Sequence, residues 1–270
     1  MVRLTHQPSV ISNQPLRASD TFRRYGPMDK HEVRKQEVVG NRQEAVRRTR
    51  EMLRSMTPEQ VKQVIEFHRD LTVFEALALA KREGKIIVPN DIHDRVLTET
   101  RDKKYLEQNY PVWTGTLVIY EKPDKKFGKG VTFSWKHDEV KYSVSFTVPK
   151  QFQGKRSCAL VIEHPDFDLV DLGNNRYEIK LVDESNIHLI ESFPNKGGWY
   201  MPHAETGILQ GEPVKESNKA IYLWRIFDSY IGLLLRDFYV DYYRRQGVYV
   251  YFRLSYVVGV HLVPLAAAEK

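Results

Sequence analysis

The amino-acid sequence predicts an α+β protein, in which an N-terminal extended arm and helices precede a mainly antiparallel, β-rich body. Three observations predict this fold class. The net charge of +6 is confined to residues 1–55. Two helix-start motifs follow between residues 57 and 75. From residue 112 onward, apolar residues recur at about every second position, the period of a strand, in place of the helical period of about 3.6 residues.

The first expected domain, residues 1–55, is a basic arm followed by a charged helix. It contains 12 Lys or Arg residues against 6 Asp or Glu, whereas residues 56–270 hold 29 of each kind. Residues 1–30 have few apolar side chains and no periodicity, which predicts an extended arm. Residues 31–55 combine many charges with a thin apolar stripe, which predicts a helix that needs a surface to lie on.

The charged helix supplies candidate contact residues for an acidic partner. Because a guanidinium group can donate two hydrogen bonds to one phosphate or carboxylate, arginine suits such a partner. The candidates are Arg42, Arg47, Arg48, Arg50 and Arg54. Nucleic acid is the obvious acidic partner, and a solvated helix or one that docks on an acidic protein surface is the alternative interpretation.

The second expected domain, residues 56–110, is a helical hairpin with a connector. Thr57 and Gln60 match a capping box, so a helix is expected over residues 58–70. Thr72 and Glu75 match a second box, whose helix is expected to end near residue 84, a glycine. A short strand is expected at residues 86–88, whereas the pattern of residues 91–100 leaves helix and strand open.

The third expected domain, residues 111–270, is the antiparallel β body. Its expected strands lie at residues 113–122, 131–135, 140–148, 157–163, 167–172, 176–182 and 187–191. Because short turns join successive strands, they predict an antiparallel sheet that is curled or folded into a sandwich.

The end of the body is expected to contain one long helix and a long strand. Residues 217–246 predict the helix, with large apolar side chains on one face and polar ones on the other, and Gly247 would end it. In residues 248–263 every even position is apolar. This register predicts one unusually long strand, or two strands joined by a bend near Ser255.

One hairpin of the body carries a possible catalytic signature. Pro165 and Asp166 precede Glu178 and Lys180, and a turn at residues 173–175 would bring Asp168 or Asp166 to the same face as that pair. The pattern resembles the PD-(D/E)xK nuclease signature. The resemblance implies that two carboxylates hold a divalent metal ion and that the lysine lies near the attacking water. A surface hairpin with Asp and Lys on its wet face is the alternative interpretation.

The remaining features favour a protein without catalysis. No cofactor fingerprint or paired metal ligands occur, so neither a cofactor nor a metal is expected, and Cys158 is the single cysteine. No signal peptide or membrane-length apolar run is evident, so an intracellular, cytoplasmic location is expected. We therefore expect a non-catalytic binding or structural component of a multi-chain assembly, virion-like or nucleoprotein-like. A metal-dependent nuclease is the alternative.

Overall fold

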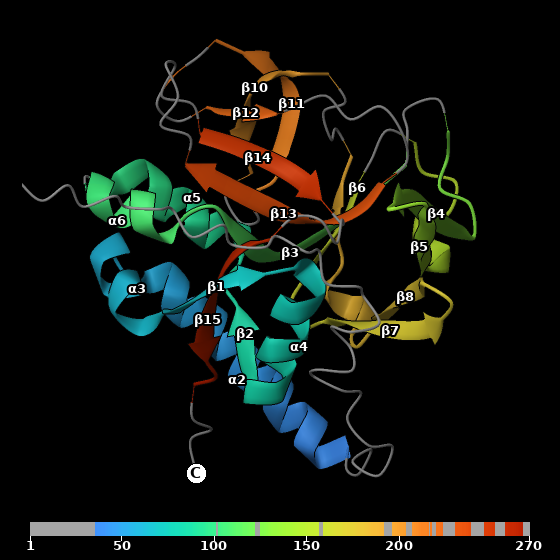
Figure 1. Cartoon of the computed structure of the whole chain (residues 1–270), viewed down its shortest axis with the longest axis horizontal. Coiled ribbons are helices and arrows are strands. Elements are labelled where there is room, and N and C mark those ends of the chain that lie inside the picture. Colours follow the sequence, from blue (N-terminus) through green and yellow to red (C-terminus); the bar gives the residue numbers. More distant parts are fainter. Residues whose placement is uncertain are drawn as a thin grey trace, which may run out of the picture.

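The computed structural model of the chain describes residues 36–100, 102–121, 125–156, 159–191, 196–203, 207–215, 217, 220–223, 230–238, 246–251 and 257–266. It is a mixed α+β structure rich in strands, as the sequence predicts (Figure 1). The helices come from the first part of the chain, and the strands build the rest. The expected extended arm, residues 1–30, lies outside the described residues.

The helices cluster between residues 36 and 109. They are α2 (Gln36–Ser55), α3 (Pro58–Val64), α4 (Val73–Glu83), α5 (Asn90–Glu99) and α6 (Lys103–Asn109), with short 3₁₀ turns η2 (Lys150–Phe152) and η3 (Glu184–Asn186) later. The charged helix predicted at residues 31–55 is thus present as α2. The ambiguous residues 91–100 belong to α5.

Fifteen strands are assigned to the described residues. They are β1 (Glu66–Leu71), β2 (Lys85–Ile87), β3 (Val112–Tyr120), β4 (Gly130–His137), β5 (Val140–Thr147), β6 (Ala159–Glu163), β7 (Phe167–Gly173), β8 (Arg176–Leu181), β9 (His188–Ile190), β10 (Gly198–Pro202), β11 (Leu209–Val214), β12 (Ile221–Leu223), β13 (Tyr230–Phe238), β14 (Gln246–Tyr251) and β15 (Val258–Pro264). The strands predicted between residues 113 and 191 all have a counterpart among β3 to β9.

Both predicted capping boxes are confirmed. The Thr57 side chain accepts a hydrogen bond from the backbone N–H of Gln60, and the Gln60 side chain accepts one from the N–H of Thr57. Thr72 and Glu75 make the same reciprocal pair at the start of α4. Gly84 caps the end of α4 at φ 64°, the left-handed conformation that glycine adopts without strain.

The main sheet has 11 strands in the order β1-β15-β3-β13-β14-β12-β10-β11, with β2 paired to β15, and β6 paired to both β3 and β9. Most neighbours are antiparallel, whereas β15–β3 and β12–β14 are parallel. A separate sheet of four strands has the order β4-β5-β8-β7, in which β5 and β8 run parallel. The mainly antiparallel body is therefore two sheets, with the largest apolar cluster drawn from both of them and from α4.

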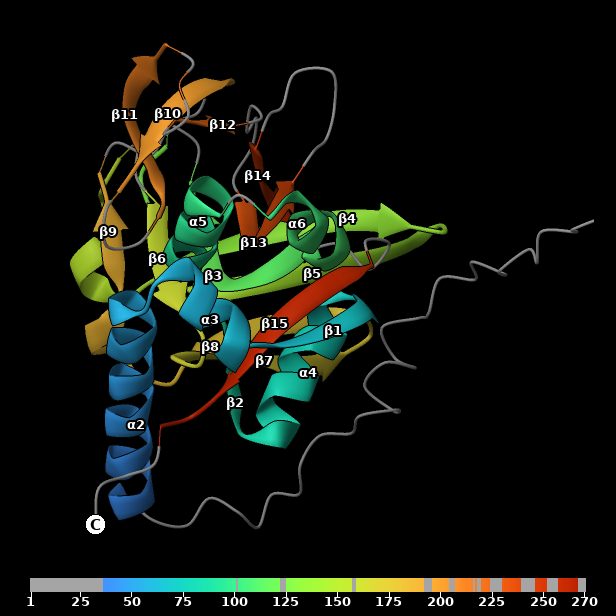
Figure 2. The same cartoon turned by 90° about the vertical axis from the view of Figure 1, so that its left-hand side faces the viewer.

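The β4–β5 hairpin forms as predicted. Its turn residues Asp138 and Glu139 have φ values of 46° and 63°, as the tight two-residue turn of a hairpin requires. Residues 173–175 turn the β7–β8 hairpin with three positive φ values of 78°, 53° and 58°. Figure 2 shows the turn end of the β4–β5 hairpin projecting beyond the neighbouring strands.

The expected helical hairpin over residues 58–84 is wrong in its first half. The helix α3 ends at Val64, and β1 follows as a strand that pairs with β15, with Glu66 opposite Leu262 and His68 opposite Val260. The sequence 66–71 has no strong strand pattern of its own. Pairing with β15, almost 200 residues away, overrides the local secondary-structure propensity of residues 66–71. A prediction from neighbouring residues alone cannot detect so distant a partner strand.

The expected long helix over residues 217–246 is also wrong. Strands β12 and β13 and the start of β14 occupy its described parts, and residues 224–229 and 239–245 lie outside the described residues. The central strand β13 pairs with β3 on one side and β14 on the other, and Ile231, Leu233 and Leu234 are buried. A strand that is buried on both faces has a continuous apolar sequence. The spacing of its apolar residues therefore cannot distinguish it from a buried helix.

The alternating segment 248–263 forms two strands, β14 and β15, which was one of the two expected outcomes. They do not pair with each other: β14 pairs with β12 and β13, whereas β15 pairs with β1, β2 and β3. Residues 252–256, where the bend was expected, lie outside the described residues.

Candidate functional site

Helix α2 presents one side to the body of the protein. Val46 and Leu53 pack in a cluster with Ile92 and Val96 of α5, and Thr49 is buried between them along the helix. Residues 46, 49, 50, 53 and 54 share this side because helical neighbours are three and four positions apart. The same spacing that buries the apolar stripe therefore brings Arg50 and Arg54 against the body.

Arg50 is the most fully engaged side chain where α2 meets the body. Its Nη1 donates to Asp166 Oδ2 at 3.0 Å, and its Nη2 donates to the backbone carbonyls of Glu163 at 3.0 Å and His164 at 2.9 Å. Its Nε lies 3.2 Å from Glu163 Oε2. The guanidinium group thus holds the turn between β6 and β7 through both side chains and backbone.

Arg54, one turn later on α2, completes the ion-pair cluster. Its Nε donates to Asp91 Oδ2 at 2.8 Å, and its Nη2 lies 3.4 Å from Glu163 Oε1. Arg95 of α5 in turn donates to the backbone carbonyls of Arg54 and Met56 at the end of α2. Two guanidinium groups therefore face three carboxylates, with Glu163 shared between them.

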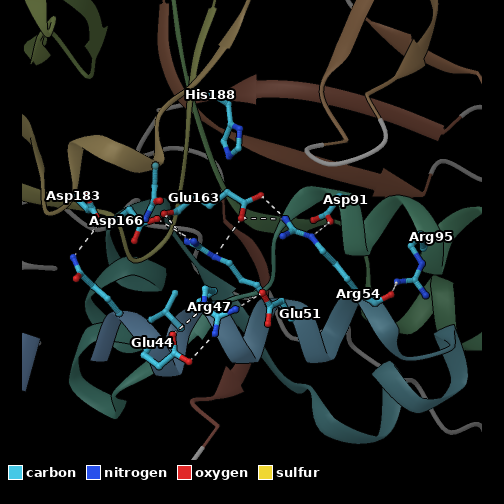
Figure 3. Close-up of a pocket in the computed structure, with 14 residues that line it drawn as sticks. Glu44, Arg47, Glu51, Arg54, Asp91, Arg95, Glu163, Asp166, Asp183 and His188 are labelled. Atoms are coloured by element: carbon cyan, nitrogen blue, oxygen red, sulfur yellow. Dashed lines mark hydrogen bonds and ion pairs between the residues drawn. The ribbon is translucent and has the colours of Figure 1, made fainter. Parts of the chain in front are cut away.

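These groups border a polar cavity of about 820 Å³ between α2, α5, η3 and β9 (Figure 3). Its lining holds four arginines and six carboxylates, together with His188, which points in from β9. The lining residues are Gln43, Glu44, Val46, Arg47, Arg50, Glu51, Arg54, Asp91, Arg95, Glu163, Asp166, Asp183, Asn186 and His188. The lining of the cavity therefore has two more carboxylates than arginines.

Burial sets the electrostatics of the inner part of the cavity. Loss of water raises the pKa of Glu163 to about 7, with Arg50 and Arg54 acting against this rise and Asp91 and Asp166 adding to it. When Glu163 is protonated, the two arginines and the two remaining carboxylates balance one to one. Burial also lowers the pKa of His164 to about 3, so this histidine is neutral, and its Nδ1 accepts a hydrogen bond from the N–H of Ile87.

The five arginines predicted to contact a partner do not act as one group. Arg50 and Arg54 face the body. Arg47, which also lines the cavity, and Arg48 pair within α2 itself: Arg47 lies 2.7 Å from Glu44 and 2.6 Å from Glu51, and Arg48 lies 2.7 Å from Glu44. Hydrogen bonds from Arg47 and Arg48 lower the pKa of Glu44 to about 2. Arg42 is exposed near the start of the helix.

The four residues of the nuclease-like hairpin lie in different surroundings. Asp166 is buried beneath Arg50, whereas Asp168 is exposed and pairs with Lys81 of α4 at 3.1 Å. Glu178 lies 3.6 Å from Lys180, which is opposite Asp168 in the β7–β8 register. Asp168, Glu178 and Lys180 thus share the outer face of the hairpin, whereas Asp166 points into the cavity.

One group of possible metal ligands converges among the described residues, and it lies elsewhere. Glu66, His68 and Glu83 each offer an atom within 4.8 Å of the others. Lys85 Nζ already lies 2.5 Å from Glu66 and 2.9 Å from Glu83. The ammonium group of Lys85 supplies the positive charge that a metal ion would otherwise bring.

The sequence patterns missed Asp91, Glu163 and Arg95. Glu163 ends a run of apolar strand residues, 159–162, and a charged residue that closes a buried strand was the available signal. Asp91 and Arg95 gave no such signal, because helix α5 could not be distinguished from a strand. Only the fold brings them to α2.

Within the described part of the chain, no helix is both long and apolar enough to cross a membrane. Comparison with protein-family models, with curated proteins and with solved structures finds no match for this chain.

Proposed function

We propose that the protein is a non-catalytic structural or binding component of a multi-chain assembly, virion-like or nucleoprotein-like, in which the basic N-terminal segment contacts an acidic partner. The observation that carries this proposal is the attachment of α2. Ion pairs from Arg50, whose side chain is 11% exposed, and from Arg54, whose side chain is 38% exposed, join the helix to buried carboxylates of the body, so a partner bound to the residues ahead of α2 is connected through the helix to the β sheets.

The ion pairs of α2 reduce the number of basic residues that are available to bind an acidic partner. Arg50 and Arg54 pair with buried carboxylates of the body, and Glu44 and Glu51 compensate Arg47 and Arg48 within α2. Residues 1–35 carry 7 Lys or Arg against 3 Asp or Glu and thus hold most of the excess charge. We therefore propose that residues 1–35, with Arg42, provide the electrostatic attraction.

The ion pairs of the nuclease-like carboxylates support a binding or structural role over catalysis. Asp166, Asp168 and Glu178 each pair with a different cation, so their negative charge is already compensated without a metal ion. The metal-dependent nuclease is not proposed for this reason.

The experiment compares two full-length variants that lose the same charge. In the first, Arg17→Gln, Arg23→Gln and Arg24→Gln neutralise part of the arm. In the second, Lys104→Gln, Lys136→Gln and Lys141→Gln neutralise exposed lysines of the body. Binding to a fluorescent polyglutamate peptide and to a short RNA is measured by anisotropy at several salt concentrations.

We expect the arm variant to lose about tenfold or more in affinity for at least one probe at low salt, with a shallower salt dependence, and the body variant to bind as the wild type does. Equal losses in both variants, or none in either, would count against the proposal.

A further inference from the structure

A second basic surface lies on the body, far in sequence from the arm. Residues 125–130 and 148–156 are joined by backbone hydrogen bonds, from Phe127 N–H to Lys155 at 2.9 Å and from Gly154 N–H to Phe127 at 2.8 Å. Lys126 and Arg156 form an antiparallel bridge beside them. The two segments therefore make one surface, which we call the loop patch.

The loop patch gathers six exposed cations. They are Lys125, Lys126, Lys129, Lys150, Lys155 and Arg156. Neither segment contains an Asp or Glu, and Asp124 directly precedes the first segment. Within the described part of the chain, none of the six side chains forms an ion pair, in contrast to the arginines of α2.

This arrangement carries an electrostatic cost in the isolated protein. Lys126 and Arg156 are directly opposite each other in their bridge, and like charges in that position are unfavourable. The nearest acidic residues along the β4–β5 hairpin, Asp138 and Glu139, are at its other end, because Gly130 pairs with Thr147 and His137 with Val140. In Figure 2 that end points away from β6, which begins shortly after the patch.

We propose that the loop patch binds the phosphate backbone of duplex nucleic acid. A duplex carries about one negative charge per 1.7 Å of its axis, so it can neutralise several clustered lysines at once. Lysine and arginine side chains that bind phosphates in this way position a protein on the backbone without reading its sequence.

The uncharged residues of the patch favour a duplex over other anionic partners. Both aromatic residues of the two segments, Phe127 and Phe152, are buried, so neither provides the exposed ring on which single-stranded bases stack. No exposed large apolar side chain lies in the segments to enter a lipid layer. At Gly128 a side chain would meet nothing within 4 Å, so the backbone there is open to a phosphate group.

The experiment uses the full chain and a short fluorescein-labelled DNA duplex. In the patch variant, Lys126→Gln, Lys129→Gln and Lys155→Gln remove three charges. The matched control carries Lys104→Gln, Lys136→Gln and Lys141→Gln, which remove the same charge from other exposed positions. Circular dichroism and thermal unfolding check that both variants fold.

For the patch variant we expect about tenfold weaker binding at low salt. The slope of log affinity against log salt should be shallower by about 0.9 for each phosphate that the variant no longer neutralises. The control should retain the affinity and slope of the wild type. Equal losses in the two variants would overturn the proposal, as would wild-type binding in the patch variant. Patch-dependent binding to phosphatidylserine vesicles that is tighter than to the duplex would overturn the nucleic-acid assignment.

The loop patch does not depend on the proposed function of the arm. Duplex binding by the arm variant, which carries Arg17→Gln, Arg23→Gln and Arg24→Gln, distinguishes the two proposals. Loss of duplex binding in the arm variant alone would overturn the patch and leave the arm proposal standing. Loss in the patch variant alone would support the patch, whatever the arm binds.

Discussion

Arg50 of α2 and Glu163 of β6 form an ion pair in which Nε and Oε2 are 3.2 Å apart and the side chains are only 11% and 4% exposed. The pair joins residues that are more than 100 positions apart in the sequence. It fixes a charged helix, which would be unstable alone, to the end of a buried strand. Both charged groups are removed from water, and the attraction between them offsets part of the free energy that this desolvation costs.

We predict that Arg50→Met destabilises the protein by about 3 kcal/mol. The substitution keeps much of the aliphatic volume but leaves Asp166 and two backbone carbonyls without their donor, and breaking one side of a buried pair costs about 3–5 kcal/mol. Urea unfolding at neutral pH measures the difference. The control is Arg47→Met, on the same helix, whose side chain is 58% exposed and whose ion pairs are weakened by the surrounding water. Equal effects would show that the buried pair has no special role.

We predict that Glu163→Gln changes how stability depends on pH. The pKa of Glu163 rises from 4.5 to about 7 on folding, so between these values the folded protein binds more protons than the unfolded chain. Its contribution to stability is therefore greatest below about pH 4.5 and falls as the pH rises to about 7, by about 3 kcal/mol.

The glutamine variant lacks this decline, and it leaves Arg50 paired with Asp166 and Arg54 with Asp91. The unfolding free energy of the variant relative to wild type should therefore increase from pH 4.5 to pH 7. A difference that stays constant over this range would contradict the raised pKa.

We predict the opposite pH effect for a buried histidine, His261 of β15. Its ring is fully buried against Phe67 and is stacked on His93 at 5.2 Å, and neither ring nitrogen has a hydrogen-bond partner among the described residues. Burial, with a smaller effect of His68, lowers its pKa from 6.5 to about 3. The folded protein therefore binds fewer protons than the unfolded chain between these values, and stability is lost as the pH falls below about 6.5.

His261→Phe should preserve the ring packing and remove this contribution. We expect a variant at least as stable as wild type at pH 7 and with its acid-unfolding midpoint at lower pH. His164, whose pKa is also lowered by burial, is still present in the variant, so the shift is partial. Acid titration followed by tryptophan fluorescence measures it, and an unchanged midpoint would show that His261 is not involved.

The features predictable from the sequence are those that local chemistry decides. The two capping boxes and the tight turns follow from a few adjacent residues, and all formed as expected. Strands β4 and β5 also followed from the sequence, because one face of each is wet and the alternation is visible. Strands β1 and β13 did not, since one depends on a distant partner and the other is buried on both sides.

The candidate site was predictable only in part, because it too depends on contacts between residues that are distant in the sequence. The arginines of α2 stand out in the sequence, but their partners come from two distant segments: Asp91 from α5, and Glu163 and Asp166 from the end of β6 and the turn after it. Sequence alone could not tell that Arg50 and Arg54 pair with the body whereas Arg47 pairs within α2, because the apolar stripe that orients α2 is thin. The loop patch likewise appears only when two segments are joined by backbone hydrogen bonds.

We predict that Gly115→Ala destabilises the protein by about 1–3 kcal/mol, the usual cost of overpacking a core. Gly115 lies in β3, where its N–H donates to Val88 at 2.8 Å and its carbonyl accepts from the N–H of His164 at 2.6 Å. A methyl group there would lie 2.3 Å from the backbone oxygen of Ile87, so β2 or β3 must move. Such a movement would also disturb the turn that Arg50 holds. Gly128→Ala is the matched control, because its methyl group would meet nothing within 4 Å. Thermal unfolding of both variants tests the prediction, and a Gly115→Ala variant as stable as the control would show that the close approach of β2 to β3 relaxes without cost.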